Sequence, residues 1–165
     1  MKYLVKILGF ALLFSTAAQA ASEIPNAPQG AHYAQGSSKP TCTLIGLTVS
    51  CTGTTIQGVG NTNAEVELVV TTTFTGTCTN KGGNLVEPFT KSTTTDTLAT
   101  VSPAENGNLQ VPEQTATGTS SEDFLKTFKC PNRNWTPEAK NPVVSYTYTL
   151  TFAGFNDPAI FITSP

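Results

Sequence analysis

The stretch from Ala64 to Cys78 alternates between apolar and polar side chains, and this period of two constrains the fold more than any other part of the sequence. Its even positions are Ala64, Val66, Leu68, Val70, Thr72, Phe74, Gly76 and Cys78. Because successive side chains of a strand point to opposite faces, we predict one buried face and one solvated face. The run is long for a single strand, so we expect a bulge or bend, with Gly76 as its site.

A second alternating run extends from Val143 to Phe155. Its apolar positions are Val144, Tyr146, Tyr148, Leu150 and Phe152, and Ser or Thr fills the positions between them. We predict that this apolar face and the even positions of the first run face one common core.

Shorter segments complete the pattern. Extended runs are predicted at 42–51 (a hairpin), 92–101, 108–111 and 159–162, and 122–129 reads as either a short helical turn or a strand. Turn residues fill 80–84 and 102–107. About seven or eight strands without a long helix predict an all-β fold, namely an antiparallel β-sandwich that is immunoglobulin-like in architecture.

Residues 1–20 have the three-part layout of a secretory signal peptide. Lys2 and Lys6 precede an apolar run, and Ala18-Gln19-Ala20 supplies small residues for cleavage. The segment 21–40 is rich in Pro, Gly, Gln and Ser and is expected to be flexible, with the β-sandwich domain at 41–165. The predicted location is therefore secreted or periplasmic.

The charge pattern argues against two classes of partner. Of nine Lys and Arg residues, Lys2 and Lys6 lie in the predicted signal peptide, which leaves seven against eleven Asp and Glu and a net charge of −4. The sequence has no basic run of the kind that binds nucleic acid or anionic lipid. Beyond residue 20 it has no apolar run long enough for a membrane span.

The four cysteines are interpreted as two disulfides because the predicted compartment is oxidising. A two-residue Gly46-Leu47 turn of type II′ places Leu44 opposite Val49 and Cys42 opposite Cys51. Directly opposed residues of a non-hydrogen-bonded pair are close enough for a disulfide. The sequence therefore predicts Cys42–Cys51 and, by elimination, Cys78–Cys130.

Several segments taken together resemble a group of small secreted bacterial proteins of uncharacterised type. They are CTLIGLTVSCTGTTIQGVGN, GTCTNKGGN, SPAENGNL, and CPNRNW followed by a strand that alternates Thr and Tyr. The resemblance covers roughly residues 41–155 and rests on turn and cysteine signatures. It implies an exported bacterial β-sandwich and carries no activity that could be transferred.

The sequence offers no strong catalytic or metal motif, so no catalytic residue, metal ligand or cofactor is assigned. His32 is the only histidine and lies in the segment predicted to be flexible. The cysteines lack the spacing of a zinc site, and no calcium-loop motif is present. Glu65 and Glu67 share one face of a strand and are the best candidates for carboxylate catalysis, although a solvated acidic face is the simpler interpretation.

The segment from Cys130 to Trp135 is the best candidate for binding. It combines a predicted disulfide with Arg133 and Trp135, the only arginine and the only tryptophan of the chain. The simpler interpretation is that Trp135 packs over the end of the core or onto the Cys78–Cys130 disulfide. We predict a non-enzymatic binding or structural module whose partner is an extracellular or periplasmic protein or glycan. The alternatives are a secreted hydrolase that uses surface carboxylates, and an inhibitor or interaction domain for another secreted protein.

Overall fold

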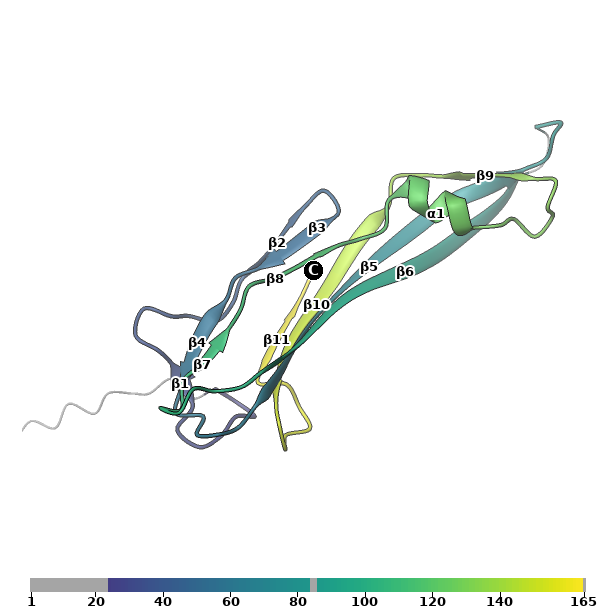
Figure 1. The fold of residues 1–165 in the computed structure, drawn as a ribbon. Coiled ribbons are helices and arrows are strands. Elements are labelled where there is room, and N and C mark those ends of the chain that lie inside the picture. The colour runs from purple at the N-terminus through teal and green to yellow at the C-terminus, as the bar shows by residue number, and fades with distance from the viewer. Residues whose placement is uncertain (1–23, 84–85, 165) are drawn as a thin grey trace, which may run out of the picture.

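A computed structural model describes residues 24–83 and 86–164, and Figure 1 shows its fold. The predicted signal peptide, residues 1–20, lies outside the described residues. The elements in chain order are β1 (His32–Tyr33), β2 (Cys42–Ile45), β3 (Thr48–Cys51), β4 (Thr54–Gln57), β5 (Ala64–Thr79), β6 (Val86–Val101), β7 (Leu109–Val111), β8 (Gln114–Thr117), α1 (Ser121–Thr127), β9 (Thr136–Ala139), β10 (Val143–Phe152) and β11 (Ile160–Thr163).

Every strand pair is antiparallel, and the strands form three sheets. The long sheet has the order β11-β10-β5-β6, and β9 also pairs with β5. The smaller sheets have the orders β2-β3-β8 and β1-β4-β7, and both lie along one side of the long sheet (Figure 1). The β5–β6 ribbon extends past the smaller sheets to an end that also carries α1 and β9 (Figure 1).

The all-β prediction is confirmed, but the predicted number of strands is too low. The described residues form eleven strands rather than seven or eight. The strands that the sequence analysis missed are β1, β4, β8 and β9. Each has no more than four residues, so its pairing partner rather than its own composition decides that it is extended.

The predicted core register is confirmed, but the prediction of one common core is wrong at Phe74, whose buried ring stacks on Phe124 outside the main cluster. Leu68 lies opposite Tyr148 and Val66 lies opposite Leu150, and all four side chains are fully buried. They join one cluster with residues of the smaller sheets, among them Val49 and Ile56. Val144 and Tyr146 also pack against this cluster but are only partly buried, because they lie closer to the edge of the core.

A bulge at Gly76, one of the two predicted irregularities, is wrong, since β5 pairs with β6 from Ala64–Val101 to Thr79–Val86 without a change of register. The irregularity lies in the neighbouring strand instead. Gly76 faces Ala139 of β9, whereas Thr73 faces Val143 of β10, so the chain carries one extra residue between these pairs. Asn141 and Pro142 occupy this bulge, where the missing N–H of Pro142 is tolerated.

The segment 21–40, predicted to be flexible, is part of the domain from Ile24 onward. Ile24 and Ala31 are buried in the core cluster. Strand β1 pairs with β4, and the N–H of Ala34 donates to the carbonyl of Thr55 at 2.9 Å. The domain boundary therefore lies before Thr41. The low apolar content of the segment was misleading because strand pairing and a few buried or half-buried side chains anchor it.

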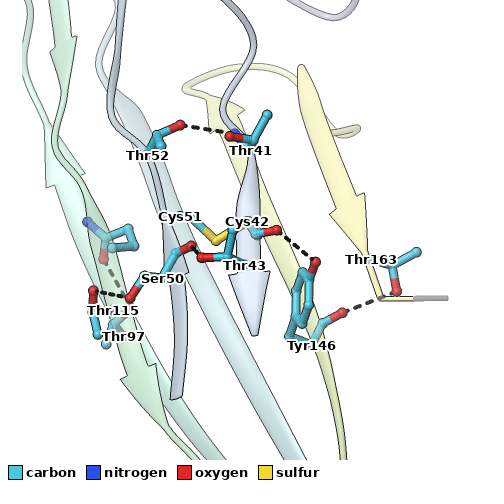
Figure 2. The surroundings of a disulfide bond; sticks show 11 residues. Thr41, Cys42, Thr43, Ser50, Cys51, Thr52, Thr97, Thr115, Tyr146 and Thr163 are labelled. Carbon is cyan, nitrogen blue, oxygen red and sulfur yellow. Dashed lines mark hydrogen bonds between the residues drawn. A yellow bond between two sulfur atoms is a disulfide. The ribbon is translucent and has the colours of Figure 1, made fainter. Parts of the chain in front are cut away.

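Both predicted disulfides are present. Cys42 and Cys51 lie opposite each other in the β2–β3 hairpin with Cα atoms 4.0 Å apart, and Leu44 faces Val49 as expected. Gly46 has a φ of 61°, as the first central residue of a type II′ turn requires. Hydrogen bonds of neighbouring Thr, Ser and Tyr side chains surround this bond (Figure 2). Cys78–Cys130 joins β5 to the loop after α1 across 52 residues.

Two buried side-chain hydroxyl groups, those of Thr72 and Tyr148, have no hydrogen-bond partner among the described residues. Tyr148 belongs to the main apolar cluster. Burial disfavours its phenolate, and nearby Tyr33 adds to the effect, so the pKa of Tyr148 is raised to about 12. Tyr148 therefore stays neutral at ordinary pH and acts as a large core side chain.

We expect Leu68→Ala and Leu150→Ala each to lower the free energy of unfolding by roughly 2–5 kcal/mol, because each leaves a cavity in a closely packed core. Thr73→Ser and Thr149→Ser, on the opposite strand face, are the controls and should change it by less than about 0.5 kcal/mol. Urea denaturation followed by circular dichroism measures all four. Equal losses in the two groups would contradict the register.

Removing Cys78–Cys130 by a double change to Ala should lower the free energy of unfolding by about 4 kcal/mol, because the bond closes a long loop. The Cys42–Cys51 bond closes a shorter loop, so its removal by the same double change should lower the free energy of unfolding by roughly 3 kcal/mol. Urea denaturation of both variants is the measurement. A Cys78/Cys130 variant as stable as the native protein would show that the Cys78–Cys130 disulfide does not stabilise the fold.

Candidate binding site

The part of the molecule beyond the main core is here called the distal end. It comprises residues 74–92, of which 84–85 are not described, and residues 119–142. It thus contains the end of the β5–β6 ribbon together with α1 and β9 (Figure 1). The smaller sheets do not cover this part of the ribbon in Figure 1, so its apolar inner face needs other partners.

Helix α1 supplies one of these partners. Ser120 caps the helix by accepting a hydrogen bond from the N–H of Asp123 at 3.1 Å. The Asp123 carboxylate also accepts hydrogen bonds from Lys126 and Ser120, and these bonds hold its pKa below the usual range. The sequence predicted a helical turn or a strand here, and the helix is the correct alternative.

A cluster of four phenylalanines forms the core of the distal end. Phe74 stacks on Phe124 with ring centroids 4.2 Å apart, and Phe128 lies 5.0 Å from Phe124. Phe89 of β6 contacts the rings of Phe124 and Phe128 at 5.9 and 4.4 Å. Phe74 and Phe124 are buried and Phe89 and Phe128 are half-buried, and aromatic rings at these distances stabilise a small core. The Cys78–Cys130 disulfide also ties the loop that follows α1 to β5.

Gly76 makes room for this arrangement. A Cβ atom at this position would collide with the Glu138 carbonyl oxygen of β9 and with the ring of Phe89. Phe89 is the cross-strand partner of Gly76, so its ring lies over the position where a side chain would otherwise be. Gly76 thus leaves space for an aromatic ring.

A cavity of about 420 Å³ opens beside this cluster. Its lining residues are Cys78, Glu87, Pro88, Phe89, Thr90, Lys91, Phe128, Lys129 and Pro131. We call it the distal pocket. Five consecutive residues of β6 form one wall, and the segment from Phe128 to Pro131 forms the other. Apolar rings with a few charged groups at the rim are the usual composition of a ligand site.

Charge is distributed unevenly along the molecule. Six of the seven basic residues beyond residue 20 belong to the distal end, which contains only four of the eleven acidic ones; the remainder of the chain is strongly acidic. Lys126 is engaged with Glu122 and Asp123, and these bonds raise its pKa. Lys91 and Lys129 line the distal pocket and are exposed. An acidic ligand is therefore favoured there over a basic one.

The predicted binding residues Trp135 and Arg133 lie in the loop that follows the pocket wall. Asn132 shapes this loop, since its side chain and carbonyl accept the N–H groups of Asn134 and Trp135 at 3.0 and 2.9 Å. Arg133 is exposed and Trp135 is half-buried. Neither residue lines the distal pocket, although Pro131 of the same loop does. Their predicted role in binding stays a prediction.

The pocket residues themselves were missed at the level of sequence. Phe89 follows a proline in a polar strand, and nothing local marks it as a binding residue. The four-residue spacing of Phe124 and Phe128 was the available signal, because it is typical of one face of a helix. Using this signal required knowing that the segment is a helix, and the sequence analysis left helix and strand as alternatives.

The other candidates are spread over the fold. Glu65 lines a shallow depression of about 380 Å³ at the opposite end of β5, and Glu67 does not line it. His32 lies in β1, half-buried, with its ring Nδ1 2.8 Å from the carbonyl oxygen of Gly30. Within residues 24–83 and 86–164 no group of three His, Cys, Asp or Glu residues is placed to hold a metal ion.

Comparisons with known proteins supply no relative. No family model, no curated protein and no solved structure matches the chain. Among the described residues, no helix has both the length and the apolar character to cross a membrane.

We expect Gly76→Ala to lower the free energy of unfolding by about 1–3 kcal/mol, because the new methyl group must displace the Phe89 ring or strand β9. Thr77→Ala, on the other face of the same strand, is the control. Urea denaturation measures stability, and the fluorescence of Trp135 reports on the distal end. An unchanged stability would mean that Phe89 does not pack on Gly76.

Proposed function

We propose that this protein is an exported, disulfide-stabilised recognition module that binds its partner through the distal pocket and catalyses no reaction. The observation that carries the proposal is the pocket itself. Phe89 and Phe128 offer it an apolar wall, Lys91 and Lys129 add positive charge, and the Cys78–Cys130 bond tethers the wall. A tethered wall loses little conformational entropy when a ligand binds.

The proposed architecture is a β-sandwich of immunoglobulin-like type. Two observations support it, namely that the smaller sheets lie along one side of the long sheet and that both contribute to one buried cluster. In such sandwiches, binding residues commonly lie at the ends, where they are carried by a rigid scaffold. The distal pocket has this location.

The proposed site of action is secreted or periplasmic. The layout of residues 1–20 supports export, and the two formed disulfides are those of an oxidising compartment. The likeness to small secreted bacterial proteins agrees with this proposal.

The composition of the pocket favours recognition over catalysis. Glu87 is the single carboxylate among its lining residues, and it stands with lysines, prolines and aromatic rings. Acid–base hydrolysis of a glycoside needs two carboxylates. The hydrolase alternative rests on Glu65, which lines a depression at the other end of the molecule. A peptide or glycan hydrolysis assay with Glu65→Gln as the control tests it directly.

A binding selection tests the proposed function. The purified protein is exposed to a library of random peptides and to a glycan array, and selected ligands are measured by fluorescence anisotropy. We expect the double variant Lys91→Glu, Lys129→Glu to weaken binding at least tenfold, because both charges line the pocket. Both side chains are exposed, so the variant should fold.

The double variant Lys81→Glu, Lys140→Glu is the matched control, because it makes the same charge change at the same end but at two exposed residues outside the pocket. It should retain binding. The proposed function is wrong if the selections yield no ligand, or if the ligands bind the pocket variant as well as the native protein. Loss of binding in both variants would indicate attraction to the general charge rather than to the pocket.

A further inference from the structure

The open edge of β6 runs along the distal pocket. β6 is the last strand of the long sheet, and within the described residues it pairs with β5 alone. Residues 87–91 of this edge strand also line the pocket. A ligand in the pocket would therefore lie beside unpaired main-chain groups of a strand, which can accept a further strand.

The hydrogen-bond pattern shows which main-chain groups face this edge. The N–H of Lys140 donates to the Thr75 carbonyl at 2.8 Å, and the N–H of Ala153 donates to the Asn63 carbonyl at 2.8 Å. The odd residues of β5 thus face β9 and β10, and its even residues face β6. In an antiparallel pair, two residues opposite each other either exchange main-chain hydrogen bonds or both direct their main-chain groups away from each other. Phe89, opposite Gly76, is bonded to β5, so Pro88, Thr90 and Ser92 present their main-chain groups to the open edge.

Pro88 supports this pattern independently. Proline has no N–H, so within a sheet it is accommodated at an edge with its nitrogen turned away from the neighbouring strand. Position 88 is one of the positions that the pattern assigns to the open side. The edge therefore offers an N–H and a C=O at Thr90, the same pair at Ser92, and the C=O of Pro88.

The side chains of β6 that line the pocket on the inner face show which side chains of an added strand would enter it. Glu87, Phe89 and Lys91 lie opposite Cys78, Gly76 and Phe74, which are buried on the inner face of the ribbon. An added strand would point every second side chain to that same face, between β6 and the segment 128–131. An apolar side chain there would meet the rings of Phe89 and Phe128, and acidic neighbours on that face would lie near Lys91 and Lys129.

We infer that the distal pocket recognises an extended acidic peptide segment, which pairs with the open edge of β6 at Pro88–Ser92 and inserts an apolar side chain between Phe89 and Phe128. This inference rests on the proposed function of the pocket and specifies the class of partner. The acidic character of the partner is inferred from charge, because the distal end has an excess of basic groups and Lys91 lies on the edge strand itself.

Backbone methylation of the ligand provides the sharpest test. The tightest peptide from the random library is synthesised with a fluorescent label and with N-methyl groups at alternate residues, in two complementary sets. Alternate residues of an added strand direct their N–H groups to β6 or to solvent. We expect one set to weaken binding roughly fivefold for each hydrogen bond removed, and the other set to leave it unchanged.

A variant of the protein tests the same contact from the other side. Thr90→Pro removes an edge N–H without touching the bonds to β5 and should weaken the unmethylated peptide roughly fivefold. Thr100→Pro is the matched control, because it has the same orientation on β6 but lies about 30 Å away. Circular dichroism checks that both variants fold. If Thr90→Pro does not fold, the methylated peptides decide alone.

The outcomes separate this inference from the proposed function. Peptides that lose affinity in Lys91→Glu, Lys129→Glu but respond equally to both methylated sets would overturn strand addition and leave the pocket as a binding site. Selection of glycans alone, or of peptides without acidic residues, would overturn the partner class. Dimerisation of the free protein through β6 would identify a second copy as the occupant and also overturn it. Ligands indifferent to the pocket variant would overturn both.

Discussion

The unbroken pairing of β5 with β6 is the constraint on which the rest of the structure depends. Sixteen residues of each strand pair in one register, and the ribbon runs beyond the cover provided by the smaller sheets. A two-stranded ribbon with one apolar face is marginal in water unless something packs against it. The chain meets this need at the distal end with α1, β9, four phenylalanines and a disulfide.

The distal pocket is a consequence of this solution. The elements that cover the ribbon come from the segment after β8, and they pack mainly on the inner face of β5 through Phe74 and Cys78. They leave a hollow against β6, where Phe89 and Phe128 form the wall. A second core that is small and built from few elements thus combines an apolar surface, positive charge and an open strand edge in one place. This combination fits recognition of an extended ligand better than it fits acid–base chemistry.

The two cores differ in how far local sequence reveals them. The main core follows from the alternation around Leu68 and Leu150, because a period of two fixes which side chains share a face whatever the partner strand is. The hairpin at Gly46 and its disulfide also follow from local sequence, because a two-residue turn determines which residues of the two strands face each other. The distal core has no such pattern. Phe89 and Phe128 are 39 positions apart in the sequence, and they meet because the chain returns to the ribbon through α1.

The sequence by itself determined the all-β class, the faces of the long strands and both disulfide pairings, since these depend on alternation, turn chemistry and the number of cysteines. It could not determine the pairing of the short strands β1, β4, β8 and β9, that Ile24 and Ala31 anchor the segment before Thr41, or that the bulge lies at Asn141 and Pro142 rather than at Gly76. Those features were decided by the tertiary structure. A short strand, a bulge or a pocket is stabilised by partners distant in the sequence, and no local pattern records which distant partner packs best.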